Sequence, residues 1–318
     1  MKKIYPIQRD GKLYIAGHRG MVGSAVWREA EKQGFKSLVG KTSQELDLRN
    51  RSAVFEFFHS ENPNYVVLAA AKVGGILAND TYPADFLSDN LLIQTNVMDA
   101  ALKYGVERLL FLGSSCIYPK FANQPITEDS LMTGRLETTN EAYAIAKIAG
   151  LVQVKAIRKQ HQKNWISAMP TNLYGPGDNY AENNSHVLPA LIRRFDEARL
   201  TGLSKVENWG TGAPRREFLF VDDLAKACLF LLDNFDGDEH INVGTGKDLS
   251  IGELAGMVAE EVGFKGEITW DSSKPDGTPR KLLDVSRING LGWKAEKPLR
   301  DGIRLAVQDY RSRFGDKE

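Results

Sequence analysis

A tyrosine and a lysine four residues apart are the first pair in this 318-residue chain whose types and spacing suggest chemistry. Tyr143 and Lys147 lie in a segment rich in helix-forming residues, for which we expect a helix over 141–160. Residues four apart share one face of a helix, so the phenol and the ammonium would project together. A phenol titrates near pH ~10, and a neighbouring cation lowers its pKa. The pair predicts proton exchange with a carbinol or carbonyl oxygen, although the same spacing also occurs on ordinary helix surfaces.

Three glycines between an expected strand and an expected helix indicate a dinucleotide site. The apolar run 13–16 leads into Gly17, Gly20 and Gly23, and a helical pattern continues over 24–32. Glycine permits a tight turn and lets a pyrophosphate approach the free N–H groups at the start of the helix. The position of the pattern, near the start of the chain and between these two elements, predicts a dinucleotide-binding loop.

The residues after the second expected strand favour NADP(H) over NAD(H). NAD-binding folds usually place an Asp or Glu there to bond the ribose hydroxyls, whereas the strand over 37–39 is followed by Gly40, Lys41 and Thr42. Arg19 lies in the glycine loop, on the side of the adenosine ribose. Two cations suit a 2′-phosphate. The alternative is that Arg19 and Lys41 are solvated surface charges.

Strands and helices alternate along the first two thirds of the chain, which predicts an α/β fold with a Rossmann-type doubly wound parallel sheet. Ligands bind beyond the carboxyl ends of such strands, and Ser114 and Cys116 follow the fourth one. The further strands of this sheet are expected at 65–69, 108–113, 165–169 and 241–244, and the further helices at 51–58, 83–104, 186–200, 250–262 and 298–314.

After residue 173 the regular alternation of expected strands and helices ends, which predicts two interleaved domains. We expect a dinucleotide-binding domain of 11–173 plus 217–247, a smaller discontinuous C-terminal substrate domain of 174–216 plus 248–318, and a loose leader over 1–10.

Composition excludes several classes of protein. Lys and Arg together number 41, as do Asp and Glu, which argues against a nucleic-acid binder that works by overall charge. The two cysteines, Cys116 and Cys228, are too far apart for a metal motif, and a disulfide framework is not expected. No apolar run approaches the roughly 18 residues that a membrane span needs. We expect a cytoplasmic protein without bound metal.

Taken together, these motifs resemble the extended short-chain dehydrogenase/reductase family and, within it, the GDP-L-fucose synthases. The resemblance runs from about Leu13 to the C-terminus, and its most distinctive stretches are 16–24, 69–75, 113–119, 170–176, 184–187 and 274–281. It implies NADPH-dependent conversion of GDP-4-dehydro-6-deoxy-D-mannose to GDP-L-fucose, by epimerisation at C3 and C5 and hydride reduction at C4. It also implies a homodimer formed through the helices 83–104 and 141–160.

The resemblance assigns roles to individual residues. The catalytic set is Ser114, Cys116, Tyr143, Lys147 and His186, in which Cys116 and His186 serve the epimerisation and the other three serve the reduction. Cofactor binding is implied for Gly17, Arg19, Gly20, Met21, Val22, Gly23, Lys41, Leu46, Leu112, Gly113, Ser114, Ser115, Tyr143, Lys147, Pro170, Thr171, Asn172, Leu173 and His186. Substrate binding is implied for Ser114, Cys116, Tyr143, Arg194, Trp209, Arg216 and Asp276.

Each of these assignments has a plainer alternative. Cys116 could be a small buried filler, His186 a polar cap before a helix, and Ser114 a turn residue. A second hypothesis is a different nucleotide-sugar enzyme of the same family, such as a 4-epimerase, a simple 4-ketoreductase or a GDP-colitose synthase. Arg19 and Lys41 argue against a 4-epimerase, whereas a GDP-colitose synthase would keep nearly all of these motifs. A catalytically silent dinucleotide-binding regulator is a third hypothesis, and the retained Ser114, Tyr143 and Lys147 argue against it.

Overall fold

The computed structural model describes residues 6–182, 185–274 and 276–315. Its centre is a six-stranded parallel sheet in the order β2-β1-β3-β4-β5-β9. The strands are β1 (Lys12–Ala16), β2 (Ser37–Val39), β3 (Tyr65–Leu68), β4 (Arg108–Leu112), β5 (Ile166–Pro170) and β9 (Ile241–Val243). The strand order reverses between β1 and β3, and a doubly wound sheet binds its ligand at that point.

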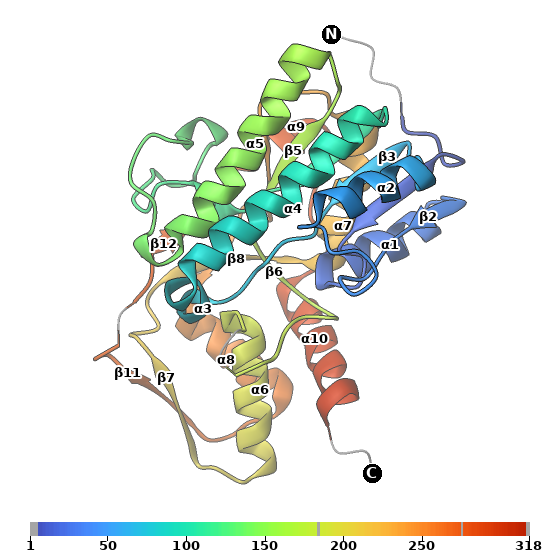
Figure 1. Ribbon diagram of the computed structural model, residues 1–318. Helices are drawn as coiled ribbons and strands as arrows, with labels where there is room; N and C mark the ends of the chain where they lie inside the picture. Colours follow the sequence, from blue (N-terminus) through green and yellow to red (C-terminus); the bar gives the residue numbers. More distant parts are fainter. Residues whose placement is uncertain (1–5, 183–184, 275, 316–318) are drawn as a thin grey trace.

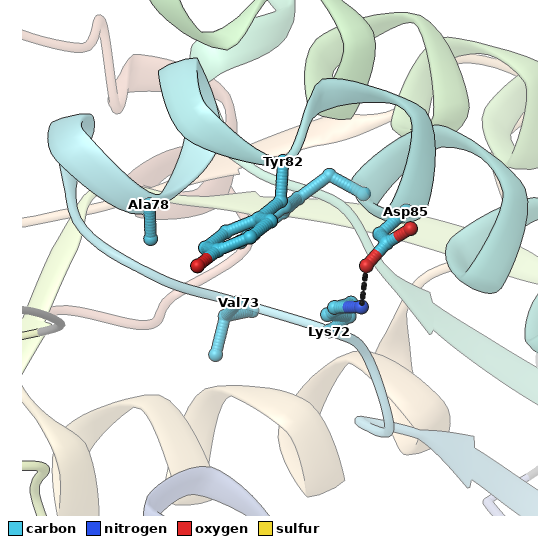
Figure 2. A pocket seen from close by; sticks show the side chains of 6 residues that line it. Lys72, Val73, Ala78, Tyr82 and Asp85 are labelled. Atoms are coloured by element: carbon cyan, nitrogen blue, oxygen red, sulfur yellow. Dashed lines mark hydrogen bonds and ion pairs between the residues drawn. The ribbon is translucent and has the colours of Figure 1, made fainter.

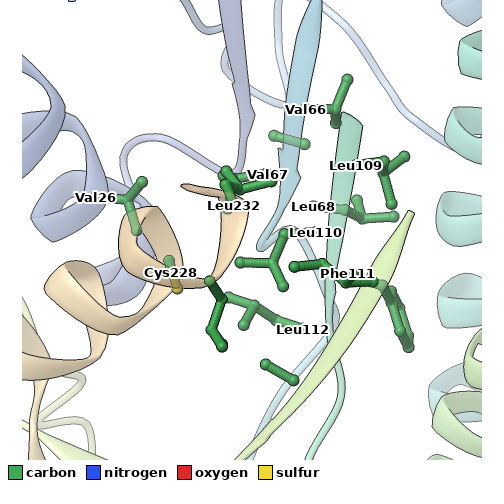
Figure 3. Packing of buried hydrophobic residues seen from close by; sticks show 14 of the residues in the cluster. Val26, Val66, Val67, Leu68, Leu109, Leu110, Phe111, Leu112, Cys228 and Leu232 are labelled. Atoms are coloured by element: carbon green, nitrogen blue, oxygen red, sulfur yellow. The ribbon is translucent and has the colours of Figure 1, made fainter. Parts of the chain in front are cut away.

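Helices cover both faces of this sheet (Figure 1). One face carries α1 (Met21–Lys32) and α7 (Val221–Asn234), which pack against each other. The other carries α2 (Arg51–Glu61), α4 (Pro83–Lys103) and α5 (Glu141–His161), of which α4 and α5 run side by side. Figure 3 shows the buried core between the layers, with Val26 of α1 and Cys228 of α7 on one side of the strands. The predicted fold class is confirmed.

A second buried cluster lies below the sheet in Figure 1. It is built on α6 (Val187–Leu200), α8 (Ile251–Val262) and α10 (Leu299–Phe314). A small sheet connects it to the first part, with β8 pairing with β6, β10 and β12, while β7 pairs with β11. These strands are β6 (Asn172–Tyr174), β7 (Lys205–Trp209), β8 (Arg215–Phe220), β10 (Asp248–Ser250), β11 (Glu267–Asp271) and β12 (Arg280–Lys281).

The structure contains several short elements that the sequence analysis did not anticipate. They are the helices α3 (Ile76–Thr81) and α9 (Ser286–Gly290), the 3-10 helices η1 (Ser115–Ile117), η2 (Glu128–Ser130) and η3 (Thr138–Asn140), and the strands β6, β10 and β12. Each is too short to show the repeat of apolar residues, every 2 residues in a strand or every 3.6 in a helix, by which the sequence reveals such elements.

The expected loose leader needs correction. Residues 1–5 lie outside the described part, but the segment that follows them is tied down. The amide of Ile7 donates to Asp233 at 3.0 Å, and Arg9 forms an ion pair with the same carboxylate at 2.5 Å. Ile7 itself is buried. Separately, no helix within the described ranges combines the length and the apolar character needed to cross a membrane.

Candidate active site

The glycine loop after β1 is shaped for close approach of the backbone. Gly17 has φ +84°, and a Cβ there would lie 2.9 Å from the backbone nitrogen of Ala70, at the end of β3. A Cβ on Gly23 would lie 2.1 Å from the Gly17 carbonyl oxygen. Gly20 differs, because its Cβ would meet only that same oxygen, at 3.4 Å. Gly17 and Gly23 are therefore required by the protein's own packing, while Gly20 faces space in front of the helix.

That space fits an anion. Helix α1 begins at Met21, which is followed by Val22. No side chain caps the start of this helix, and its first turn contains no acidic residue. The N–H groups at a helix start carry a partial positive charge, and here they remain available for a phosphate.

Arg19 and Lys41 both lie near the carboxylate of Glu45, which the sequence analysis did not consider. Glu45 accepts two hydrogen bonds from Thr42, from its amide and its hydroxyl, both at 2.8 Å. These bonds, followed by the charges of Lys41 and Arg19, lower the pKa of Glu45. Among the described residues, neither Arg19 nor Lys41 forms an ion pair with Glu45, whose carboxylate is bonded to Thr42. The two cations therefore remain suited to a phosphate.

Tyr143 and Lys147 project from α5 toward the carboxyl end of β4, as their spacing predicts. The Lys147 ammonium is buried and donates to the carbonyl oxygen of Leu112 at 2.9 Å. It lies 5.9 Å from the centre of the Tyr143 ring. Burial lowers the pKa of Lys147 to about 8.

The expected low pKa of Tyr143 is not what the structure shows. Burial raises the pKa of the phenol, the charge of Cys116 raises it further, and a hydrogen bond with Ser114 lowers it. Burial is the main cause, and the Lys147 ammonium donates to the Leu112 carbonyl instead of to the phenol. In this state the phenol keeps its proton and can donate it.

Ser114 and Cys116 stand at the turn from β4 into η1. The Ser114 hydroxyl accepts a hydrogen bond from the amide of Cys116 at 3.3 Å and also bonds Tyr143. The Cys116 sulfur is half-buried and accepts from the Asn140 amide group at 3.4 Å. The ammonium of Lys281, which arrives on β12, lies 3.8 Å from the same sulfur. Cys116 is thus in contact with polar donors and is not an apolar filler.

His186 immediately precedes α6, and its side chain makes no capping bond. His186 is exposed by surface area, yet the protein around its ring removes part of the water, which lowers its pKa, and the charge of Lys281 lowers it further. Lys281 therefore acts on both Cys116 and His186. The structure brings these two residues to one cation, although they are 70 positions apart in the sequence.

The residues expected to bind substrate form an outer group around β7 and β8. Arg194 donates to Asn208 at 2.9 Å and to the carbonyl of Glu207. Next to them, the Trp209 side chain is 67% exposed, and the ammonium of Lys274 lies 5.8 Å from its ring centre.

Two further residues of the outer group, Asp276 and Arg216, connect it to the catalytic residues. Asp276 accepts from the amide and the hydroxyl of Thr211, at 2.9 and 2.7 Å. Arg216 is influenced by both Cys116 and Asp276, although burial is the main effect and lowers its pKa. Arg216 therefore lies between the inner and the outer residues.

A pocket of about 270 Å³ lies between the segment that follows β3 and the helices α3 and α4 (Figure 2). Its lining includes Lys72, Tyr82 and Phe86, and the ring of Phe86 packs edge-on against Tyr143 at 6.3 Å between ring centres. Lys72 forms ion pairs with Asp85 at 3.1 Å and Asp89 at 2.9 Å. Phe86 therefore lines the pocket and also contacts the ring of Tyr143.

The remaining expected cofactor residues lie along the same edge. Leu112, Gly113 and Ser115 are at the end of β4, and Pro170 to Leu173 continue from β5 into β6. Leu46 follows Lys41 in the same turn, where its amide donates to the carbonyl of Thr42 at 2.9 Å, and its side chain packs with the core.

A buried carboxylate, missed from the sequence, organises this edge. Glu217 accepts from the amides of Thr245, Gly246 and Leu283 at 2.6, 2.7 and 3.0 Å. Its backbone carbonyl accepts from the side chains of Thr171 and Asn172. Glu217 therefore joins the segment after β5 to the strand that carries Lys281.

The sequence analysis also missed Asn140 and Lys281 as site residues. An Asn directly before a helix normally caps it, which is the role that position alone suggests for Asn140. Its side chain makes no capping bond and turns to Cys116 instead. Lys281 appeared only as the last residue of the stretch 274–281, and no local signal places it beside a cysteine 165 residues away.

The family assignment follows from a model of the NAD dependent epimerase/dehydratase family that matches residues 13–244. The chain belongs to this family. It is 60% identical to GDP-L-fucose synthase 1 of Arabidopsis thaliana, over 95% of this chain and 94% of that one. It is 38% identical to GDP-L-colitose synthase of Yersinia pseudotuberculosis, over 94% of this chain and 97% of that one.

Among solved structures, the fold is similar to a GDP-mannoheptose C4 reductase from Campylobacter jejuni with NADP bound. The two chains are 40% identical and superpose with a TM-score of 0.88. The similarity covers 96% of this chain and 99% of that one. The family resemblance drawn from the motifs is confirmed.

Proposed function

We propose that this chain converts GDP-4-dehydro-6-deoxy-D-mannose to GDP-L-fucose with NADPH, by epimerisation at C3 and C5 followed by reduction at C4. The observation that carries the proposal is the convergence of Cys116 and His186 on Lys281, directly beside Ser114 and Tyr143. A plain ketoreductase needs the Ser114, Tyr143 and Lys147 arrangement but has no use for an additional thiol and imidazole.

The cofactor side is supported by backbone geometry and charge. When bound, NADPH supplies the hydride that reduces C4. We propose that the loop of Gly17, Gly20 and Gly23 and the uncapped start of α1 hold its pyrophosphate, and that Arg19 and Lys41 hold a 2′-phosphate. The other residues proposed to line this site are Met21, Val22, Leu46, Leu112, Gly113, Ser114, Ser115, Tyr143, Lys147, Pro170, Thr171, Asn172, Leu173 and His186.

Ser114 and Tyr143 are proposed to serve the oxygen on C4 in both stages. Removal of a proton from C3 or C5 places negative charge on that oxygen as an enolate, and reduction places negative charge there as an alkoxide. Hydroxyl donors aimed at one point stabilise both anions. The raised pKa of Tyr143 favours this role, because a protonated phenol can donate to the alkoxide.

Cys116 and His186 are proposed to exchange the protons on C3 and C5. The C4 ketone acidifies both positions, and inversion needs groups that remove a proton and return one. A thiol and an imidazole both cycle protons near neutral pH.

The outer group is proposed to hold the nucleoside diphosphate. Arg194 and Arg216 supply guanidinium groups, which pair well with phosphates, and the exposed Trp209 offers an aromatic face. Asp276, fixed by Thr211, is proposed to orient a polar group of the substrate.

The decisive experiment combines product analysis with proton exchange. The enzyme is incubated with GDP-4-dehydro-6-deoxy-D-mannose and NADPH, and the product sugar is identified by NMR. We expect GDP-L-fucose. In parallel, loss of deuterium from C3 and C5 is followed without NADPH, where Cys116→Ser and His186→Gln should slow exchange by at least about a hundredfold. Wild-type exchange in both variants would reduce the proposal to a plain ketoreductase.

GDP-colitose synthase is the nearest alternative, since it would use the same residues on a sugar that differs at C3. The higher identity to a GDP-L-fucose synthase favours the first substrate. Turnover of the 3-deoxy sugar in preference to the 3-hydroxy sugar would reverse the assignment.

We also propose a cytoplasmic homodimer in which α4 and α5 of each subunit pack together. The stripe Ile145, Ala149, Val152 and Ala156 lies on one side of α5, and Ile145 and Val152 are 45% and 48% exposed. Leu92 of α4 is similarly exposed, at 47%. Apolar residues at helical spacing on two adjacent helices suit a helix-packed interface. Sedimentation velocity should show a dimer that Val152→Glu converts to a monomer.

The proposed domains are 11–173 plus 217–247 for the cofactor and 174–216 plus 248–318 for the substrate. The two separate buried clusters support this division. Leu283 to Trp293 nevertheless pack with the first cluster, so the boundary passes through β12.

A further inference from the structure

The carboxylate of Glu217 is surrounded by backbone amides from two separate segments. Its Oε1 accepts from the amides of Thr245 and Gly246 at 2.6 and 2.7 Å, and its Oε2 accepts from the amide of Leu283 at 3.0 Å. The residue is fully buried, and a Cβ on Gly244 would lie 2.3 Å from Oε1. Glycine at position 244 therefore leaves the space that the carboxylate fills.

These three amides depend on this one side chain. Burial raises the pKa of Glu217, and the hydrogen bonds from the amides act in the opposite direction. A buried donor that loses its acceptor costs more free energy than an ordinary hydrogen bond contributes. A change in the acceptor capacity of this side chain should therefore displace at least one of the two segments that it joins.

Glu217 lies on the face of the small sheet opposite to the groups of the substrate side. Strand β12 pairs with β8 in a register that places Lys281 opposite Arg216. Paired residues project from the same face of a sheet, and successive residues of a strand project from opposite faces. Arg216 and Lys281 therefore share one face, where the Lys281 ammonium lies 3.8 Å from the Cys116 sulfur, and Glu217 projects from the other.

Strand β12 needs support from side chains, because it contains only two residues and forms few ladder bonds. The amide of Leu282, directly after the strand, donates to the side chain of Gln124 at 2.9 Å. The next amide, that of Leu283, donates to Glu217. The first of these bonds is partly exposed and the second is buried, so water competes only with the first. Glu217 is thus the firmer attachment of this segment.

The backbone of Glu217 serves the cofactor side separately. Its carbonyl oxygen accepts from the side-chain amide of Asn172 at 2.8 Å and from the hydroxyl of Thr171 at 3.3 Å. Both residues belong to the segment proposed to line the cofactor site. Glu217 therefore contacts the cofactor segment through its main chain and the β12 segment through its side chain, and a substitution of the side chain changes only the second contact directly.

We propose that Glu217 is a positioning residue, whose carboxylate fixes β12 against β8 so that Lys281 and Arg216 face the nucleotide sugar. The identity of that nucleotide sugar rests on the function proposed above. Glu217 acts through the backbone of β12 and touches neither substrate nor cofactor. Its loss should consequently weaken the substrate side of the site while the cofactor side keeps its affinity.

The test uses Glu217→Gln, which keeps the shape of the side chain but has one acceptor oxygen in place of two. The orientation that keeps two hydrogen bonds places its NH2 group against the amide of Leu283, where two donors oppose each other. Amide hydrogens of the segment 279–285 should exchange at least about fivefold faster, measured by mass spectrometry, while those of 171–174 keep their rate. GDP should bind at least about fivefold more weakly by calorimetry, and NADPH affinity should change by less than about twofold by fluorescence titration.

The matched control is Asp223→Asn, the same loss of charge at another buried carboxylate. Asp223 accepts from the amides of Glu296 and Lys297 at 3.0 and 2.7 Å and joins α7 to the segment before α10. This variant should leave the affinities for GDP and NADPH and the exchange of 279–285 unchanged. Denaturant unfolding of both variants shows whether they lose comparable stability.

Three results would overturn the proposal. The first is an equal loss of GDP and NADPH affinity in Glu217→Gln, which indicates a general structural role. The second is unchanged GDP affinity with unchanged exchange of 279–285. The third is rapid exchange of 279–285 in wild type, which needs no variant. If Glu217→Gln does not fold, Glu217→Asp, which withdraws the carboxylate by one methylene, should show the same selective loss of GDP affinity.

The same measurements separate this role from the proposed function, because binding and amide exchange need no turnover. Failure of wild type to form GDP-L-fucose, together with a selective loss of GDP affinity in Glu217→Gln, rejects the proposed function alone. Formation of GDP-L-fucose by Glu217→Gln with the kcat and KM of wild type, together with unchanged exchange, rejects the positioning role alone.

Discussion

The cofactor side and the substrate side of this site are built in different ways. On the cofactor side, the main features are backbone: a glycine loop pressed against the end of β3, and an uncapped helix start. On the substrate side, they are side chains from distant segments, such as Cys116, His186 and Lys281, joined by single hydrogen bonds and charges. Backbone geometry leaves a local pattern in the sequence, whereas contacts between distant side chains do not.

Tyr143 stands where the two sides meet, and its removal should have the largest effect. Tyr143→Phe should lower the rate of C4 reduction roughly a thousandfold, because the alkoxide loses its proton donor. Deuterium exchange at C3 and C5 should persist at a reduced rate, since Ser114 still supports the enolate. NADPH oxidation followed by absorbance, together with NMR of labelled substrate, measures both. Near-normal reduction would remove Tyr143 from the centre of the site.

How far the sequence predicted each side follows from this contrast. The glycine loop, the helix of Tyr143 and the parallel sheet were predicted, because each depends on spacing within a few residues. The direction of the Lys147 ammonium was not, because spacing shows that two side chains share a face and not which acceptor they choose. The pKa of Tyr143 was consequently expected to fall, and burial raises it.

The substrate side was predicted only through resemblance to a family. Nothing within ten residues of Lys281 indicates that it contacts Cys116. The position of Asn140 directly before a helix suggests only a helix cap. Glu217 occupies a strand position with no local sign that three amides would surround its carboxylate. Such contacts follow from how β8, β12 and η1 meet in space, which local preference does not encode.

The cofactor side can itself be divided by comparing two glycines. Gly23→Ala places a Cβ 2.1 Å from a backbone oxygen, so the fold must shift, and we expect a loss of about 3 kcal/mol in the free energy of unfolding. Gly20→Ala meets that oxygen only at 3.4 Å, so stability should change by less than about 1 kcal/mol while NADPH affinity falls. Denaturant unfolding and fluorescence titration measure the two quantities. Equal stability losses would contradict the division.

The charges on the cofactor side should affect one cofactor and not the other. Arg19→Ala combined with Lys41→Ala should raise the KM for NADPH at least about tenfold, because the 2′-phosphate loses two charged partners. The KM for NADH should change little, since that cofactor lacks the phosphate. Steady-state kinetics with both cofactors provide the comparison. Similar losses for both would show that the two residues are surface charges or support the loop.

The smallest effect on the reaction itself is expected from a buried carboxylate on the substrate side. Asp178 lies in the turn between β6 and His186 and is 5% exposed. Burial raises its pKa to about 7, against smaller opposing effects from the amide of Asn179 and from Arg313. The backbone of this turn is attached to α10, since the amide of Gly177 donates to Asp309 at 3.0 Å and Arg313 donates to the Asp178 carbonyl.

The sign of the pH dependence follows from proton binding. Between pH ~4 and the raised pKa of about 7, the folded protein keeps a proton on Asp178 that the unfolded chain has lost. Stability from this group should therefore fall as pH rises across that window and level off above it. Asp178→Asn should reduce this decrease in the free energy of unfolding by about 1 to 3 kcal/mol, measured by denaturant unfolding at a series of pH values. NADPH affinity should not change, because the turn belongs to the substrate side. An unchanged pH profile would show that solvent reaches the carboxylate, and a loss of cofactor affinity would show that the two sides are coupled through this turn.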